Sequence, residues 1–143
     1  MSTIAITQSA YIQLIERCQQ ELPREACGVL TGTAATQGIP AIVTHVHAIT
    51  NIHEDPFRSF RFHPGEWVSV YYDMQKNRQT LVGFFHSHPT SSVTPSKRDW
   101  LGLPASEEQA SYWIISMADG PVPVVQPYRH AGQTFCPLTL MFA

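Results

Sequence analysis

The stretch TLVGFFHSHPTSSVTPSKRD, residues 80–99, carries both a strand signal and a group of polar residues suited to chemistry. Its first part, TLVGFF, is an apolar run of the kind that is typical of a buried strand. Side chains two residues apart in a strand point to the same face of the sheet. We therefore expect His86 and His88 to present their imidazoles on one face, at the end of this strand.

Two imidazoles and one carboxylate are a typical set of three protein ligands for a catalytic zinc, which leaves the fourth position for water. Asp99 follows His88 after a loop long enough to turn back toward the strand. Zinc lowers the pKa of its bound water to about 7 and so makes hydroxide available at neutral pH. The stretch therefore predicts a zinc site formed by His86, His88 and Asp99.

Ser96 and Asp99 also form an S-x-x-D pattern, which is typical of a helix N-cap followed by an acidic residue in the first turn. The two interpretations are compatible, because a capped helix is a rigid support for a metal ligand. Zinc hydrolysis also needs a base that takes the proton of the water and passes it to the leaving amine. Glu25, in LPREACGVLTG, is the acidic candidate if its strand neighbours the strand of His86.

Helix and strand patterns are intermixed along the chain, so we predict an α/β domain with a mixed central sheet flanked by helices. Helices are expected from Tyr11 to Leu22, beginning near Thr7 or Ser9 and ending at Pro23; from Pro64 to Met74; and from Pro95-Ser96 through Leu101. Strands are expected at 27–33, 40–50, 58–62, 80–85, 110–118, 122–128 and 134–142.

Three segments of the chain resemble the signature of the JAMM (MPN+) metalloprotease family. They are PREACGVLTG, Asn51 within AITNIHEDPFRSFRFHP, and VGFFHSHPTSSVTPSKRD. The family pattern is an upstream Glu, then His-Ser/Thr-His-Pro, then Ser-x-x-Asp, and all of these positions are present at the family spacing. The resemblance runs from about Tyr11 to the last strands. It implies a single MPN-like domain over residues 1–143, with a layout like that of the cytidine deaminases.

The resemblance also implies a role for each motif residue. His86, His88 and Asp99 would bind zinc, Glu25 would act as general base and acid, and Ser96 would donate to the oxyanion. The family cleaves isopeptide or peptide bonds just after the C-terminal Gly-Gly of ubiquitin or ubiquitin-like proteins, and the tail is usually bound as an added strand. The implied cofactor is therefore Zn²⁺, and the implied partner is the tail of a ubiquitin-like protein.

The chain departs from the larger deubiquitinases of the family, because the part after Asp99 has no room for their long insertion. It is similar to the compact prokaryotic members, although Thr90 stands where some members carry an acidic residue. For such members the resemblance implies either release of a sulfur-carrier protein from a small adduct such as cysteine, or isopeptide removal from proteins. The rival hypothesis is a non-catalytic MPN-type scaffold domain, but degenerate members lose ligands that this sequence keeps. A peptidase for short peptides shares the site and differs only in its substrate.

Other polar patterns carry a weaker signal. His45 and His47 are also two residues apart on an expected strand, but polar alternation on a solvent-facing strand explains them better than a metal site with Asp55. Cys27 lies close to Glu25, yet Cys-His catalysis needs an exposed thiolate and ACGVL is typical of a buried residue. The H-x-E and C-x-x-C motifs of zinc deaminases are absent from the sequence. Three further histidines are expected in loops or turns: His53, His63 and His130.

The composition excludes several classes of protein. A net charge of −2 without a basic run argues against nucleic-acid binding. No stretch approaches the roughly 20 apolar residues that cross a bilayer, and the start lacks a signal-peptide pattern. Three scattered cysteines suit reduced thiols in a cytoplasm. Only 14% of residues are charged, which is compatible with a homodimer; an uncharged Thr-, Ser- and Gln-rich surface explains it at least as well.

Overall fold

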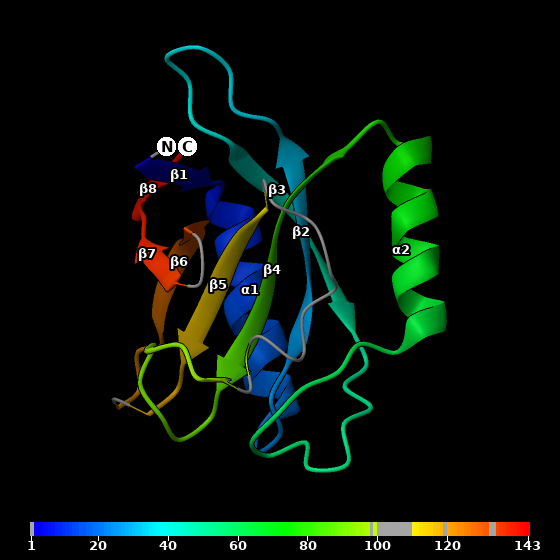
Figure 1. Ribbon diagram of the computed structural model, residues 1–143, viewed down its shortest axis with the longest axis vertical. Coiled ribbons are helices and arrows are strands. Elements are labelled where there is room, and N and C mark those ends of the chain that lie inside the picture. Colours follow the sequence, from blue (N-terminus) through cyan, green and yellow to red (C-terminus); the bar gives the residue numbers. More distant parts are fainter. Residues whose placement is uncertain (1, 98, 100–109, 119, 132–133) are drawn as a thin grey trace.

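The described strands form one eight-stranded mixed sheet with two long helices packed against it (Figure 1). The computed structural model describes residues 2–97, 99, 110–118, 120–131 and 134–143. The elements are β1 (Thr3–Ile6), α1 (Gln8–Glu21), β2 (Cys27–Thr33), β3 (Ile42–Ile49), α2 (Pro64–Lys76), β4 (Thr80–His88), β5 (Ser111–Ser116), β6 (Val124–Ala131), β7 (Thr134–Pro137) and β8 (Thr139–Phe142).

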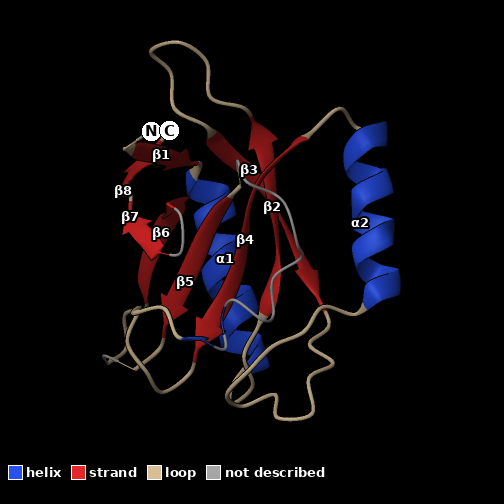
Figure 2. Cartoon of the chain, viewed as in Figure 1, coloured by secondary structure: helices blue, strands red, loops and turns tan. Residues whose placement is uncertain are grey.

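The strand order is β7-β6-β5-β4-β2-β3-β1-β8 (Figure 2). Strands β4 and β5 pair in parallel, as do β1 with β3 and β1 with β8, whereas the remaining neighbours are antiparallel. The predicted mixed sheet is therefore confirmed. Strand β4, which ends in the two motif histidines, lies near the middle of the sheet with β2 on one side and β5 on the other.

Helix α1 begins where the sequence pattern predicts. The hydroxyl of Thr7 accepts a hydrogen bond from the amide of Ala10 at 3.2 Å, so Thr7 is the N-cap. The helix ends just before Leu22-Pro23, because proline cannot continue the backbone ladder. The predicted face carries its buried residues, Ala10, Leu14 and Cys18.

The structure also confirms the helix predicted to begin at Pro64. Pro64 occupies the first turn, and the Nδ1 atom of the N-cap residue His63 accepts a hydrogen bond from the amide of Glu66 at 3.1 Å. His63 is therefore a capping residue, as its place before Pro64 predicts. None of the helices in the described part of the chain is long and apolar enough to cross a bilayer.

Alternate residues of β4 fill two separate cores on the two faces of the sheet. Phe85 belongs to the core that α1 covers, and Phe84 belongs to the core against which Trp67 of α2 packs. Because side chains alternate along a strand, His86 and His88 lie on the same face as Phe84. The motif histidines therefore point to the α2 side of the sheet.

Residues 58–62, predicted as a short strand, form a loop segment that is held by the side chain of Asn51. The Nδ2 atom of Asn51 donates to the carbonyl of Ser59 at 3.0 Å. Its Oδ1 atom accepts from the amides of His53 and Arg61 at 3.0 and 3.1 Å. Phe62 alone forms an isolated β-bridge, with Asn51. The strand prediction is wrong for the rest of the segment, where the side chain of Asn51 takes the carbonyl of Ser59 and the amide of Arg61.

The last predicted strand, 134–142, is divided between the two edges of the sheet. Strand β7 pairs with β6, whereas β8 pairs with β1 beside the N-terminus (Figure 1). Buried Leu138 separates the two, and its amide donates to the carbonyl of Pro127 at 2.9 Å. Because only one residue lies between β7 and β8, the two edge strands of the sheet, β7 and β8, lie close together at this point.

Two further predictions differ from the structure. Strand β1 is absent from the sequence prediction, because four residues are too few to show a clear period of two. His130 lies within β6 and not in a turn. Of the predicted helix through Leu101, Lys97 and Asp99 are helical, and most of the remainder lies outside the described residues.

Candidate metal centre

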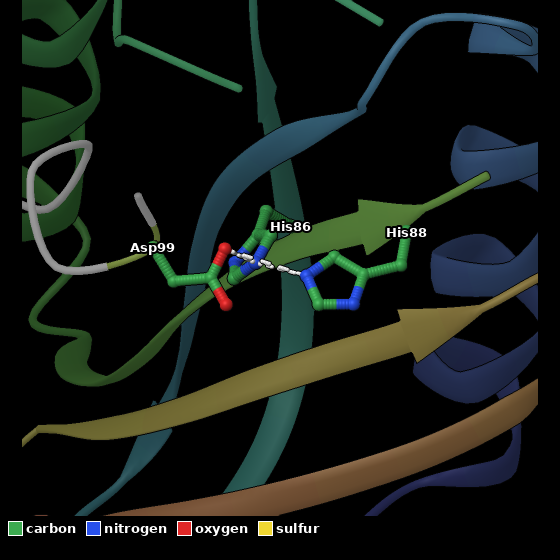
Figure 3. Close-up of side chains that lie close together, drawn as sticks. All are labelled: His86, His88 and Asp99. Atoms are coloured by element: carbon green, nitrogen blue, oxygen red, sulfur yellow. Dashed lines mark hydrogen bonds and ion pairs between the residues drawn. The ribbon is translucent and has the colours of Figure 1, made fainter. Parts of the chain in front are cut away.

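Strand β4 brings the two motif histidines to one point, and Asp99 meets them there (Figure 3). The Nε2 atoms of His86 and His88 lie 3.1 Å apart. Oδ1 of Asp99 lies 2.9 Å from the first of these nitrogens and 3.3 Å from the second. All three side chains are buried. The structure therefore brings together the three residues that the sequence nominates for metal binding.

A backbone carbonyl sets the tautomer of His88. Its Nδ1 atom lies 2.6 Å from the carbonyl oxygen of Ser92, and because a carbonyl can only accept, Nδ1 carries the proton. When the ring is protonated, Nε2 carries the second proton and donates it to Oδ1 of Asp99, 3.3 Å away. Burial by itself lowers the pKa of His88, but the hydrogen bonds to Asp99 and to the Ser92 carbonyl outweigh it, so the net pKa is raised.

Asp99 is held in place by the backbone of Ser96. The Ser96 amide donates to Oδ2 of Asp99 at 2.7 Å, while Oδ1 faces the histidines. Burial alone would raise the pKa of Asp99. The hydrogen bonds from His86, His88 and the Ser96 amide outweigh that effect and hold the pKa well below its usual range. Asp99 is therefore an anion that faces two imidazoles.

The imidazole ring of His86 stacks on an aromatic ring. Phe60 stacks on it with ring centroids 4.5 Å apart and an interplanar angle of 20°. Burial lowers the pKa of His86, with Asp99 opposing that effect, so the ring favours the neutral form that binds metals. Phe60 comes from residues 58–62, the segment predicted as a strand, and no sequence signal marks it as part of the site.

The donor set fits a zinc ion. Two neutral imidazole nitrogens and one carboxylate oxygen are the ligand types of a catalytic zinc site. Because Nδ1 of His88 donates to the carbonyl of Ser92, its Nε2 atom is the one left to face Oδ1 of Asp99, where a metal ion could take the place of the shared proton. Within the described ranges this is the one group of three or more such residues whose ligand atoms all lie within 4.8 Å of one another.

The pairing of β2 with β4 places Glu25 near this centre. Glu25 immediately precedes that ladder and is only 4% exposed. Its amide donates to the carbonyl of Pro56 at 2.7 Å, and its carbonyl accepts from Nδ2 of Asn51 at 3.0 Å. The charge of Glu25 also contributes to the raised pKa of His88, which reflects their proximity. The strand that follows Glu25 therefore neighbours the strand of His86, as the role of base requires.

Glu25, His88 and Ser96 line one pocket of about 530 Å³. The side chain of Ser96 is exposed, so its hydroxyl is accessible to a substrate. The loop after β4 and the loop before α2 supply the rest of the described lining. A peptide bond that enters this pocket would therefore meet a carboxylate and a hydroxyl beside His88.

Three side chains from neighbouring strands clamp the loop that follows β4. His88 donates to the carbonyl of Ser92, the hydroxyl of Ser116 donates to the carbonyl of Ser91 at 2.7 Å, and the phenol of Tyr128 donates to the carbonyl of Val93 at 2.6 Å. Three consecutive carbonyls are thus tied to β4, β5 and β6. Strand periodicity alone does not distinguish Ser116 and Tyr128 from core residues, so no sequence pattern marks either of them as part of the site.

His45 and His47 belong to a polar network on β3 that is separate from the metal centre. Nε2 of His47 lies 3.0 Å from the hydroxyl of Thr31, and Nδ1 of His45 lies 3.1 Å from Nε2 of Gln79. They form no metal-type group with Asp55 in the part of the chain that the structure describes.

Cys27 is a buried residue, as the sequence predicts. It is 1% exposed, and burial, followed by the charges of nearby carboxylates, raises the pKa of its thiol far above the usual value. Its Sγ atom donates to the carbonyl of Ile49 at 3.3 Å. A thiol in this state is not an activated nucleophile.

Comparison with known proteins agrees with this fold and this site. Residues 7–129 match the family of prokaryotic homologs of the JAB domain, so the chain belongs to that family. The resemblance to JAMM (MPN+) proteins that the motif carries is therefore confirmed, and the group His86, His88 and Asp99 corresponds to the metal-ligand part of that motif.

Several individual proteins are similar to this chain. A desampylase of Haloferax volcanii is 35% identical over 102 residues, which are 68% of this chain and 66% of the relative. A CysO-cysteine peptidase of Mycobacterium tuberculosis is 30% identical over 117 residues, which are 82% of this chain and 70% of the relative. This chain thus spans just under two thirds of the desampylase. The solution structure of a Desulfitobacterium hafniense protein has a TM-score of 0.84 and 29% identity, and the match covers 98% of this chain and 92% of that one.

Proposed function

We propose that this chain is a zinc-dependent isopeptidase or peptidase that hydrolyses the bond after the C-terminal Gly-Gly of a ubiquitin-like or sulfur-carrier protein. One observation carries the proposal: the ligand atoms of His86, His88 and Asp99 converge beside a pocket that Glu25 also lines. The kinship with a desampylase and a CysO-cysteine peptidase, both hydrolases, supports the class of substrate.

His86, His88 and Asp99 would hold the zinc ion through two Nε2 atoms and one carboxylate oxygen. Bound zinc supplies a water of lowered pKa, about 7, and polarises the scissile carbonyl. The chain itself supplies the rigidity of the site. Ser92 orients one imidazole, Phe60 supports the other, and the amide of Ser96 orients the carboxylate.

Glu25 is the general base and then the general acid in this proposal. Its carboxylate takes a proton from the attacking water and delivers it to the nitrogen of the leaving amine. Such a transfer needs a carboxylate held at a constant position. The backbone of Glu25 is fixed on both sides, by Pro56 at its amide and by Asn51 at its carbonyl.

Ser96 is the oxyanion donor in this proposal. Ser96 lines the same pocket as Glu25 and His88, and its backbone amide is anchored to Asp99. A donor that is already in place costs little reorganisation when negative charge develops on the carbonyl oxygen. Ser96 would thus act both through its amide, which positions Asp99, and through its hydroxyl, which contacts the substrate.

Metal content tests the first part of the proposal. We expect about one zinc per chain in untagged protein purified without chelator, loss of that zinc in His88→Ala, and full retention in His45→Ala. His45 is a suitable control because it is an exposed histidine of β3 that does not line the pocket. If the wild-type protein binds no zinc even after zinc is added, the non-catalytic scaffold hypothesis gains support instead.

Hydrolysis tests the second part of the proposal. The zinc-loaded protein should cleave a ubiquitin-like tail ending in Gly-Gly from an attached amine, and Glu25→Gln should not. Zinc binding without any cleavage would again favour a scaffold.

We further infer a cytoplasmic location from three cysteines that are all free thiols, Cys18, Cys27 and Cys136. A homodimer is a prediction that size-exclusion chromatography tests.

A further inference from the structure

The pocket beside the metal centre carries two cationic side chains that the mechanism above does not use. Arg58, from the loop between β3 and α2, and Lys97, from the segment after β4, both line it together with Glu25 and His88. Glu25 is the single carboxylate in the described lining. Apart from His88, the described lining therefore carries two cationic side chains and one carboxylate.

Among the described residues, neither cation has a carboxylate within ion-pair distance. The ion pairs among the described residues all involve histidines, so Arg58 and Lys97 have no carboxylate partner in this part of the chain. The pocket also carries the hydroxyl groups of Thr90 and Thr94, which can act as additional hydrogen-bond donors. A concave surface with two cations that have no described carboxylate partner, and with several hydroxyls, is suited to an anionic group. A guanidinium matches the geometry of a carboxylate.

The substrate of the proposed reaction limits where such an anion comes from. A Gly-Gly tail has no charged side chain next to the scissile bond. An amino acid joined through its α-nitrogen carries its own carboxylate two bonds from the scissile nitrogen. A lysine joined through its ε-nitrogen inside a protein has only a neutral backbone, several bonds further away. The two kinds of leaving group therefore differ in charge at the place where the two cations lie.

We propose that Arg58 and Lys97 form a subsite for the free carboxylate of the leaving group. The protein then prefers a Gly-Gly tail joined to a single amino acid over a tail joined to a lysine of a protein. This inference rests on the proposed function, and it names the leaving group that the proposal leaves open. Arg58 and Lys97 act in it as specificity-determining residues, not as parts of the hydrolytic machinery.

Two peptides that differ in one group test the subsite. Both carry the same Gly-Gly segment followed by alanine, one with a free carboxylate and the other with a carboxamide; alanine is used so that no substrate thiol binds zinc. For the zinc-loaded wild-type protein we expect kcat/KM to be roughly fivefold or more higher for the carboxylate, the scale of one ion pair at a partly solvated site. Arg58→Gln and Lys97→Gln should each lower that ratio toward one.

A matched control is Lys76→Gln, because Lys76 is an exposed cation at the end of α2 that lines neither of the pockets near Glu25. It should keep the wild-type ratio. Equal kcat/KM values for the two peptides in the wild-type protein would overturn the inference. It would also be overturned if the two pocket variants slowed both peptides equally, since the cations would then act on the carbonyl that the peptides share.

Binding without turnover separates this inference from the proposed function. The zinc-loaded Glu25→Gln variant should bind the carboxylate peptide more tightly than the carboxamide in calorimetry, and adding Arg58→Gln should remove the difference. Equal affinities would overturn the subsite whether or not the wild-type protein is an enzyme. Failure of the wild-type protein to cleave either peptide, or a lysine-linked tail, would instead overturn the proposed function.

Discussion

Cys27 of β2 lies directly opposite His86 of β4 in the antiparallel ladder. The next residues along each strand lock this register, because the amide of Ser87 donates to the carbonyl of Ala26 at 3.0 Å, and the Ser87 hydroxyl accepts from the Ala26 amide at 2.8 Å. Glu25 is the residue before Ala26, at this end of the ladder. The pairing of two strands far apart in the sequence thus brings the candidate base to the candidate metal centre.

Glu25→Gln should leave zinc bound and reduce kcat by about 10²–10⁴-fold, because an amide cannot accept the proton of the attacking water. Elemental analysis and a peptide-cleavage assay on the same preparation measure both effects. Glu21→Gln is the control, since Glu21 is an exposed carboxylate that lines only the smaller neighbouring pocket. Normal turnover by Glu25→Gln would remove Glu25 from the mechanism.

Asp99→Ala should weaken zinc binding by more than about 100-fold, the upper range seen when only an outer-shell partner of a ligand is lost. Titration against a chelating dye measures the affinity. Asp73→Ala, which removes an exposed carboxylate of α2, should bind zinc as the wild type does. A full equivalent of zinc held as tightly in Asp99→Ala as in the wild type would count against Asp99 as a ligand.

Ser96→Ala should keep its zinc, because the amide that positions Asp99 remains, and should reduce kcat by up to about 10²–10³-fold. The comparison is with Ser92→Ala, in the same loop, whose hydroxyl bonds to Thr94 while its carbonyl orients His88. The carbonyl survives that substitution, so the control should stay active. An unchanged rate in Ser96→Ala would reduce Ser96 to a support for Asp99.

Tyr128→Phe should weaken zinc binding by about 10-fold, within the range known for outer-shell partners, because the carbonyl of Val93 loses its donor and the loop that orients His88 loosens. Burial, and then the charge of Asp99, raise the pKa of Tyr128, so the phenol keeps its proton at neutral pH and remains a donor. Tyr72→Phe, at a phenol on the exposed side of α2, is the control. Equal zinc affinities in the dye titration would show that the clamp does not act on the site.

His47 should make the fold less stable in mild acid. Burial lowers the pKa of His47 below its ordinary value of 6.5, with smaller opposing effects from Gln79 and Asp73. The unfolded chain therefore binds more protons than the folded chain as the pH falls through 6.5, so stability decreases in that window. Above it, the imidazole is neutral in both states and has no effect on the pH dependence.

Thermal unfolding between pH 5 and 8, in saturating zinc, measures this dependence. His47→Gln should flatten the acid side of the curve relative to the wild type, whereas His45→Gln, at the exposed histidine two residues earlier, should not. Working in saturating zinc keeps the contribution of His86 and His88 the same in all three proteins. Parallel curves for wild type and His47→Gln would show that His47 titrates alike in both states.

Local patterns in the sequence predict most of the fold correctly. Helices α1 and α2 follow from their periodicity, from a Thr7 cap and from Pro64, and strands β2 to β4 follow from apolar and β-branched runs. The errors occur where distant residues decide the outcome. Residues 58–62 have a strand-like alternation, but the side chain of Asn51 takes the carbonyl of Ser59 and the amide of Arg61, and only Phe62 forms a β-bridge. The segment 134–142 reads as one strand because nothing local shows that its halves pair with different edges.

The sequence by itself determined the kind of chemistry, because His86 and His88 share a face through the two-residue period of one strand, and Asp99 follows Ser96 within a single turn. Only the tertiary structure decided how the site is completed. The register of β2 on β4 brought Glu25 to the pocket, and the clamp on the loop after β4 set the tautomer of His88. Strand periodicity acts over two residues, whereas sheet pairing joins residues about sixty apart, and no local pattern encodes that contact.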